Sequence, residues 1–194
     1  VQQDGEAWHD TAWKYRRRLT LSSHAEQPLR AGLPVSIDVD AGYLTIAGKC
    51  AKDWSDVAVV HKGKRIPTIV RPGRRDTNFE LWFRLPEDLA SGAKDGSYWI
   101  YYGNPAATNS ATPGEIFDLY EDFTGPLDKL RILLDTDVKA RCANGKLVIE
   151  DVSTDRTERA PAKLRIRDFP ALTGFAVDFE LDVECPEGAS FALA

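Results

Sequence analysis

Hydrophobic and polar residues alternate with a period of two along most of the chain, and helical periodicity is scarce. This alternation is typical of strands that bury one face. In the first half it predicts the strands WKYRRRLTL (13–21), LPVSIDV (33–39), VAVVH (57–61), KRIPTIV (64–70), FELWFRL (79–85) and SYWIYY (97–102). Strands at this density, with turn residues between them, predict an all-β fold, an antiparallel β-sandwich of immunoglobulin-like or jelly-roll-like type.

The alternation also predicts which side chains face the core. One face of the first strand carries Trp13, Tyr15, Leu19 and Leu21, and Arg17 intrudes on it, as expected near a sheet edge. FELWFRL directs Phe79, Leu81, Phe83 and Leu85 inward, and Glu80, Trp82 and Arg84 outward. Trp82 is therefore an aromatic residue on a polar face, which core packing does not explain.

A second unit is expected after the segment GNPAATNSATPGE (103–115), whose composition is that of a linker or long turn. Beyond it, GKLVIED (145–151), KLRIRDF (163–169) and FAVDFELDVEC (175–185) read as strands. We expect an N-terminal tail over 1–11, a β-sandwich over 12–112, and over 113–194 the first part of a second β-domain, cut short after SFALA. The alternative is that the later strands complete a sheet of the first unit.

Charge and composition restrict the partners. The 194 residues carry a net charge of −5, made up of +2 over residues 1–112 and −7 over 113–194, which argues against a nucleic-acid partner. No apolar run has the length of a membrane span. The chain has no Met and opens VQQDGEAWHD, as a secreted or periplasmic protein does after loss of a signal peptide, or as a trimmed chain does.

Motifs for catalysis are scarce, so we expect no enzymatic activity. His9, His24 and His61 lie in no metalloprotease pair, and no nucleophile elbow accompanies them. The three cysteines lack CxxC spacing; Cys142 and Cys185 could pair with each other, or all three could be separate buried thiols. The run Arg71, Arg74 and Arg75 is interpreted as a solvated loop rather than a grip on an anion.

Acidic residues gather in EIFDLYEDF (115–123). Glu115, Asp118, Glu121 and Asp122 supply the hard oxygen ligands that calcium prefers, with Asp118, Glu121 and Asp122 the candidate ligands. Two such carboxylates could also serve a glycosidase. The competing interpretation is that these residues form a solvated strand edge, which involves neither calcium nor catalysis. No other cofactor is expected.

Aromatic residues are the better lead, because planar rings on a rigid sheet can stack on the apolar faces of sugars. In SYWIYY either Trp99 and Tyr101 or Tyr98 and Tyr102 must face away from the core, and that pair requires a cover or a ligand. The residues predicted to contact a ligand are Trp54, Trp82, Arg84, Trp99 and Tyr101. For the β-strand aromatics, packing under a cover is the competing interpretation.

Three stretches resemble a known family: WKYRRRLTL, DVAVVHKGKRIPTIV and YWIYYGNPAATNSATP. They are similar to a bacterial domain of unknown function that occurs in secreted or surface proteins and at the extracytoplasmic N-terminus of ExbB/TolQ-type proton-channel proteins. The resemblance covers about residues 12–112. In that family a segment like GEIFDLYEDF commonly opens a concanavalin-A-like (LamG-like) jelly roll. Trp54 departs from the pattern, since a small residue is common there.

The resemblance implies a β-sandwich, a periplasmic or extracellular location and a carbohydrate- or surface-binding role. It supplies no catalytic residues. We therefore expect a non-catalytic binding module for a glycan or a cell-envelope component, as part of a larger ExbB/TolQ-like transport protein. Its partners could then include other subunits of a proton-channel complex. The alternatives are a structural protein–protein interaction module of a membrane transport complex and a fragment of a polysaccharide hydrolase.

Overall fold

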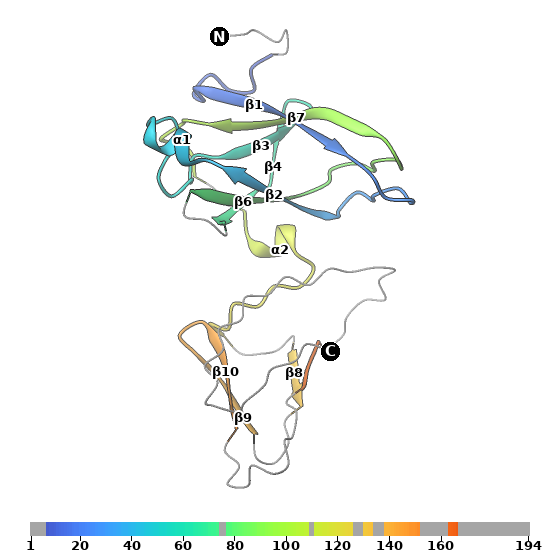
Figure 1. The fold of residues 1–194 in the computed structure, drawn as a ribbon, viewed down its shortest axis with the longest axis vertical. Coiled ribbons are helices and arrows are strands. Elements are labelled where there is room, and N and C mark those ends of the chain that lie inside the picture. Colours follow the sequence, from blue (N-terminus) through green and yellow to red (C-terminus); the bar gives the residue numbers. More distant parts are fainter. Residues whose placement is uncertain are drawn as a thin grey trace. The chain divides into compact units, whose positions relative to one another are not determined.

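The computed structural model describes residues 7–73, 77–108, 111–125, 130–133, 138–151 and 163–166. The chain divides into two compact units, Val1–Tyr120 and Glu121–Ala194 (Figure 1). In the described residues both units are built from antiparallel strands, accompanied by two short helices, α1 (Gly42–Ile46) and α2 (Pro113–Ile116). The predicted all-β class is confirmed.

The first unit is a sandwich of two antiparallel sheets. The four-stranded sheet has the order β1-β7-β3-β4 and contains β1 (Tyr15–Ser22), β7 (Lys94–Tyr102), β3 (Ala58–His61) and β4 (Lys64–Ile66). The three-stranded sheet has the order β2-β6-β5 and contains β2 (Pro34–Asp40), β6 (Asn78–Arg84) and β5 (Ile69–Pro72). Among the described strands, β7 and β3 are therefore flanked on both sides in the four-stranded sheet, and β6 is flanked on both sides in the three-stranded sheet.

The core between the two sheets follows the predicted alternation. Phe79, Leu81 and Phe83 of β6 are at most 1% exposed, and Leu85 just after the strand is 2% exposed. Apolar residues of the four-stranded sheet, among them Tyr98 of β7, pack against these side chains. The buried members of this cluster are Ala41, Cys50, Val57, Val59, Phe79, Leu81, Phe83, Tyr98 and Ile100.

The edge strand β1 confirms one expectation and corrects another. Arg17 is exposed on a strand that pairs only with β7 among the described strands, so its place at an edge is confirmed. Trp13, in contrast, does not share the face of Leu19 and Leu21. It lies before the strand begins at Tyr15 and is buried in a different cluster, because the alternation of faces holds only within a strand.

Glycine fits the turns that require a left-handed backbone. The hairpin between β3 and β4 turns at Lys62 and Gly63, both with positive φ, as in the two-residue turns that match strand twist. At the end of β7, Gly103 has φ +83°, and a Cβ there would meet the Tyr15 ring at 2.7 Å. Only glycine lets the chain leave the sheet this closely against β1.

The first unit continues past the expected boundary at residue 112. Helix α2 starts with Pro113 in its first turn, and the Glu115 carboxylate accepts hydrogen bonds from the N–H and hydroxyl groups of Thr112 at 2.7 and 3.0 Å. Ile116 is fully buried. The compact unit therefore ends at Tyr120, because this segment packs on the sandwich instead of opening the next domain.

The second unit contains two pairs of strands among its described residues. β8 (Leu130–Leu133) pairs with β11 (Lys163–Ile166), and β9 (Val138–Ala143) pairs with β10 (Lys146–Asp151) around an Asn144–Gly145 turn. The predicted strands GKLVIED and KLRIRDF thus coincide with β10 and β11. The predicted strand at 175–185 lies outside the described residues, and the concanavalin-A-like assignment stays a prediction.

Candidate ligand-binding surface

The aromatic residues of β7 divide between the two faces of the four-stranded sheet. Tyr98 and Ile100 point into the inter-sheet core, where Tyr102 packs against the same cluster. Burial raises the pKa of Tyr98 to about 12, with smaller contributions from the charges of Asp95 and Glu87. Trp99 and Tyr101 lie on the opposite face, which none of the other described sheets of this unit covers.

The cover on that face comes from the N-terminal segment 7–13, called here the strap. Trp8 meets the Tyr101 ring edge-on at 5.6 Å between centroids, and Trp13 does so at 6.2 Å. The strap is also tied by hydrogen bonds: Trp8 Nε1 donates to the Trp13 carbonyl at 3.0 Å, and the His9 N–H donates to the Tyr101 hydroxyl at 3.1 Å. The predicted tail 1–11 is thus, from residue 7 onward, part of the sandwich.

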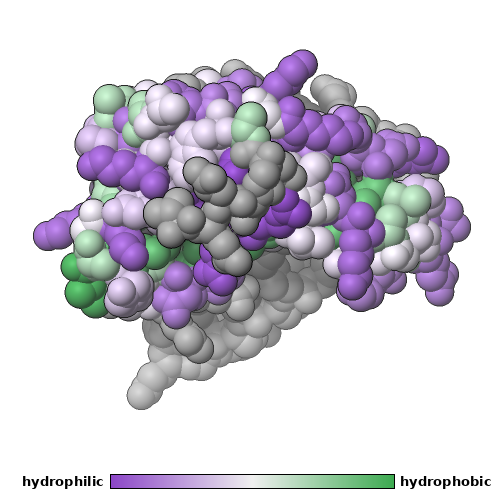
Figure 2. Space-filling model, turned by 90° about the horizontal axis from the view of Figure 1, so that it is seen from above, coloured by the Kyte–Doolittle hydropathy of each residue, from purple (hydrophilic) through white to green (hydrophobic). Residues whose placement is uncertain are grey.

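The covered rings are closed to ligands in this arrangement. Trp99 is 4% exposed and Tyr101 is 1% exposed. Figure 2 views this side of the first unit, and among its coloured residues hydrophilic and intermediate ones dominate while hydrophobic ones lie mainly at the margins. Of the two interpretations, a ligand or a cover, the structure shows the cover. Trp99 and Tyr101 are therefore core residues of a second, smaller cluster.

Trp54 also has a packing role. Its ring lies 5.4 Å from the ring of Phe79, at the margin of the inter-sheet core. Its φ of +55° is in the left-handed region, which favours glycine or asparagine and explains why a small residue suits this position. The indole N–H is buried and has no hydrogen-bond partner among the described residues. Trp54 as a whole is half-buried, and its predicted contact with a ligand stays a prediction.

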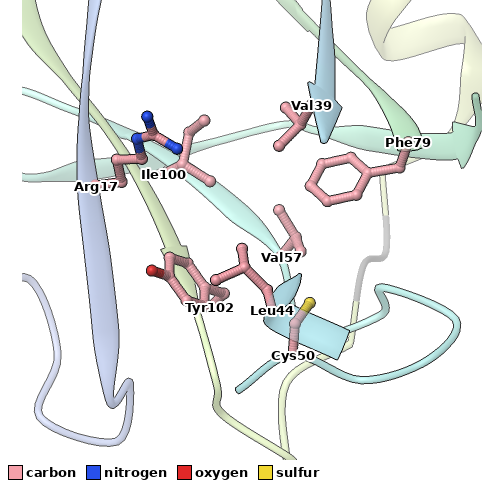
Figure 3. Close-up of a pocket in the computed structure, with 8 residues that line it drawn as sticks. All are labelled: Arg17, Val39, Leu44, Cys50, Val57, Phe79, Ile100 and Tyr102. Carbon is pink, nitrogen blue, oxygen red and sulfur yellow. The ribbon is translucent and has the colours of Figure 1, made fainter. Parts of the chain in front are cut away.

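A small cavity is lined by Arg17 and by residues of the inter-sheet core (Figure 3). Its volume is about 20 Å³, room for about one water molecule. The lining residues are Arg17, Val39, Leu44, Cys50, Val57, Phe79, Ile100 and Tyr102. A sugar ring does not fit a space of this size, so the cavity is a packing defect and not a ligand site.

The outer face of the three-stranded sheet carries Trp82. Register places Ser36 of β2 and Ile69 of β5 directly beside Trp82, forming one row across three strands. The next row consists of Asp38, Glu80 and Arg71. Side chains that are directly opposite in neighbouring strands share a face. The row that contains Trp82 and a row of charged residues therefore lie next to each other on the outer face.

Trp82 has aromatic neighbours from a distant part of the sequence. Phe117 meets its ring edge-on at 5.1 Å, and Tyr120 stacks on Phe117 at 5.9 Å. The guanidinium of Arg71 lies 5.0 and 5.2 Å from the centroids of Phe117 and Tyr120. All four side chains are half-buried. We call Asp38, Arg71, Glu80, Trp82, Phe117 and Tyr120 the Trp82 surface.

Arg84 lies at one end of the Trp82 surface, and its guanidinium is hydrogen-bonded to other residues of the protein. Its guanidinium donates to the carbonyls of Gly32 at 2.6 Å and Glu115 at 3.0 Å, and to the Asp118 carboxylate at 2.9 Å. These bonds hold the segment that contains Phe117 against β6. The structure thus gives Arg84 a positioning role, and its predicted direct contact with a ligand stays a prediction.

The acidic residues proposed for calcium make local hydrogen bonds. Asp118 accepts from Arg84, Glu121 accepts from the N–H of Phe123, and Asp122 accepts from the hydroxyl and N–H of Thr124. The bonds from Thr124, first its hydroxyl and then its N–H, lower the pKa of Asp122. In the described part of the chain no three His, Cys, Asp or Glu side chains are grouped to hold a metal ion. The calcium site stays a prediction.

Two of the three cysteines are described, and both carry free thiols. Cys50 is buried, whereas Cys142 on β9 is partly exposed. Cys185, its suggested partner, lies outside the described residues. The suggested pairing of Cys142 with Cys185 therefore involves a residue outside the described part of the chain and stays a prediction.

Sequence reasoning missed the aromatic partners of Trp82. The segment 115–123 was interpreted through its carboxylates, whereas its contribution to the surface comes from Phe117 and Tyr120. The signal was present in the sequence, because Ile116, Phe117 and Tyr120 are apolar residues that follow a predicted linker. What the pattern lacked was the identity of the sheet on which they pack.

Comparison with known proteins identifies one region. Residues 53–132 match the model of DUF2341, a domain of unknown function. No curated protein and no solved structure matched the chain. Among the described helices none is both long and apolar enough to cross a bilayer. The matched region contains Arg71, Trp82, Phe117 and Tyr120, so most of the Trp82 surface lies in the part of the chain that is similar to the DUF2341 family of uncharacterised domains.

Proposed function

We propose that the first unit is a non-catalytic binding module for a glycan, with the Trp82 surface as its binding face. One observation carries this proposal: Trp82, Phe117 and Tyr120 form a half-buried aromatic strip on the outer face of a sheet, next to a row of charged side chains. Aromatic rings bind the C–H faces of sugars, and carboxylate and guanidinium groups can hydrogen-bond the hydroxyls.

The setting that we propose is extracytoplasmic, in the periplasm or at the cell surface. Support comes from the family resemblance described above, in which such domains occur in secreted proteins and at the N-terminus of ExbB/TolQ-type channel proteins. The module would then bind a glycan or another cell-envelope component for a larger transport protein. A nucleic-acid partner is disfavoured by the net charge of −5.

The test is a glycan array and an insoluble-polysaccharide pull-down with the wild-type chain, Trp82→Ala and Tyr43→Ala. Tyr43 is 72% exposed on α1, away from the Trp82 surface, so it controls for the loss of an exposed aromatic residue. A stacked ring contributes about 1 kcal/mol at the low end, so we expect Trp82→Ala to weaken binding about fivefold. Circular dichroism of both variants verifies folding.

Three results would change the proposal. Glycan binding that is equal in wild type and Trp82→Ala would remove the Trp82 surface from the function. Absence of binding to every glycan would leave the second candidate, a protein–protein interaction module, whose basis is the exposed pair Tyr43 and Ile46 on α1. Turnover of any polysaccharide would favour the hydrolase alternative.

Addition of EDTA tests the calcium hypothesis, and we expect it to leave binding unchanged.

A further inference from the structure

The charged row of the Trp82 surface has an unusual composition. Glu80 stands in the middle strand, directly opposite Asp38 on β2 and directly opposite Arg71 on β5. Two carboxylates that face each other across neighbouring strands repel, because directly opposed side chains have their Cβ atoms about 5 Å apart. A cation between them would relieve that repulsion.

Both carboxylates are held in place but keep capacity to accept more hydrogen bonds. One oxygen of Glu80 accepts from the Trp82 indole N–H at 3.2 Å. One oxygen of Asp38 accepts from the Asn78 amide at 3.1 Å. A carboxylate has about four acceptor positions, so one protein donor leaves most of them available. Each bond also fixes the orientation of the side chain that it reaches.

The one positively charged residue of the row, Arg71, contacts aromatic rings. The Arg71 guanidinium lies over the rings of Phe117 and Tyr120, at 5.0 and 5.2 Å from their centroids. Arg84 at the other end is bonded to Asp118 and to two carbonyls. The strip beside Trp82 that a ligand would meet, between β2 and β6, therefore presents negative charge.

From this arrangement we infer that the glycan bound by the Trp82 surface carries free amino groups, and that Asp38 and Glu80 select it over acidic glycans. This inference rests on the proposed function. One sugar ring stacks on Trp82, and its ammonium group lies between the two carboxylates. Uronic acids bring a carboxylate to the same place and are repelled. Neutral N-acetylated sugars keep the stacking but lose the ionic contact.

The experiment compares three oligosaccharides of equal length by titration calorimetry at low salt: a glucosamine oligomer with free amines, its N-acetylated form, and a galacturonate oligomer. An exposed ion pair contributes up to about 1 kcal/mol. We therefore expect the free-amine oligomer to bind about fivefold more tightly than the acetylated one, with the galacturonate weakest. Added salt reduces the advantage of the free amine, since exposed charges are screened.

Variants separate the two contacts. Asp38→Asn and Glu80→Gln should abolish the preference for the free amine, so that each variant binds the free-amine and the acetylated oligomers equally, whereas Trp82→Ala weakens binding of both oligomers. Glu26→Gln removes one exposed loop carboxylate and serves as the control for net charge. Thermal unfolding of each variant verifies the fold, and Gln at position 80 retains an oxygen for the Trp82 N–H.

The outcomes distinguish this inference from the proposed function. If acidic or acetylated oligomers bind as tightly as the free amine, but Trp82→Ala still weakens them, the charge selection is wrong and the glycan-binding function stands. If the free-amine preference persists in Asp38→Asn and Glu80→Gln, these residues are not its source. If no oligomer binds in a manner that depends on Trp82, both proposals fall together.

Discussion

The guanidinium of Arg16 lies over the ring of Trp99, with its Cζ 4.1 Å from the ring centroid. The Trp8 ring is on the same guanidinium at 4.5 Å, and one nitrogen of Arg16 donates to the Ala7 carbonyl and the Tyr101 hydroxyl. Arg16 thus joins the strap to the outer face of the four-stranded sheet, and its charge is accommodated by rings and oxygens together.

Arg16→Lys should therefore destabilise the protein. Lysine keeps the charge but loses the planar group that stacks on the rings of Trp8 and Trp99. A partly desolvated cation–π contact is worth about 1 kcal/mol, and we expect a loss of about 1–2 kcal/mol in the free energy of unfolding, measured by urea denaturation. Arg17→Lys, an exposed neighbour in the same strand, is the control. Equal effects of the two changes would contradict the stacking role.

Ile116 should anchor the segment after the linker. Its side chain is fully buried, whereas that of Ile46 on α1 is 87% exposed. Ile116→Ala is expected to lower the free energy of unfolding by about 2–4 kcal/mol through the lost burial and the cavity left behind. Ile46→Ala makes the same chemical change on the surface and should shift it by less than about 0.5 kcal/mol. If both variants are as stable as wild type, the segment does not dock as described.

Cys50 should resist alkylation in the native state. Its Sγ–H donates to Asp56 at 3.2 Å, and burial, followed by this hydrogen bond and the Asp56 charge, raises the pKa of the thiol to about 12. At pH 8 only roughly one Cys50 in ten thousand is then a thiolate, the reactive form. Peptide mapping after iodoacetamide treatment should find Cys142 labelled and Cys50 protected.

Labelling in guanidinium provides the control, because all cysteines are then accessible and Cys50 should react. The Asp56 carboxylate, which accepts the hydrogen bond from Cys50, also accepts hydrogen bonds from the N–H groups of Ala51 and Gly103, each at 2.9 Å. Native labelling of Cys50 at the rate of Cys142 would show that this buried network opens readily.

Asp95 should contribute to the acid sensitivity of the fold. Burial acts to raise its pKa, but hydrogen bonds from the Ser97 hydroxyl and N–H, together with nearby His61, lower it below the ordinary value of 3.8. A carboxyl whose pKa is lowered by folding stabilises the protein above its unfolded pKa, and this stabilisation is lost as the pH falls below it. The free energy of unfolding should decrease between pH 5 and pH 2.

Asp95→Asn removes the titrating group, so its free energy of unfolding should depend less on pH over the same range. Glu26→Gln, in the exposed loop between β1 and β2, should leave the slope of the wild type unchanged. The measurement is urea denaturation at several pH values. A slope for Asp95→Asn equal to that of the wild type would assign the acid sensitivity to other carboxyls.

The predictions made from the sequence that hold are those that depend on local periodicity. Phe79, Leu81 and Phe83 face the core and Trp82 faces outward, because successive side chains of a strand point to opposite faces wherever the strand lies. The all-β class and the edge position of Arg17 follow from the same rule. Trp13 was misassigned since it precedes the strand, where the rule does not apply.

The tertiary structure decided what covers each face and what lies beside each strand. Alternation separates Trp99 and Tyr101 from Tyr98, but it contains no information about the strap that buries the first pair. Likewise the sequence places Trp82 outward without revealing that Asp38, Arg71 and Phe117 come to lie around it. Local periodicity depends on the geometry of one strand, whereas these neighbours depend on contacts between segments far apart in the chain, and only the folded arrangement brings them together.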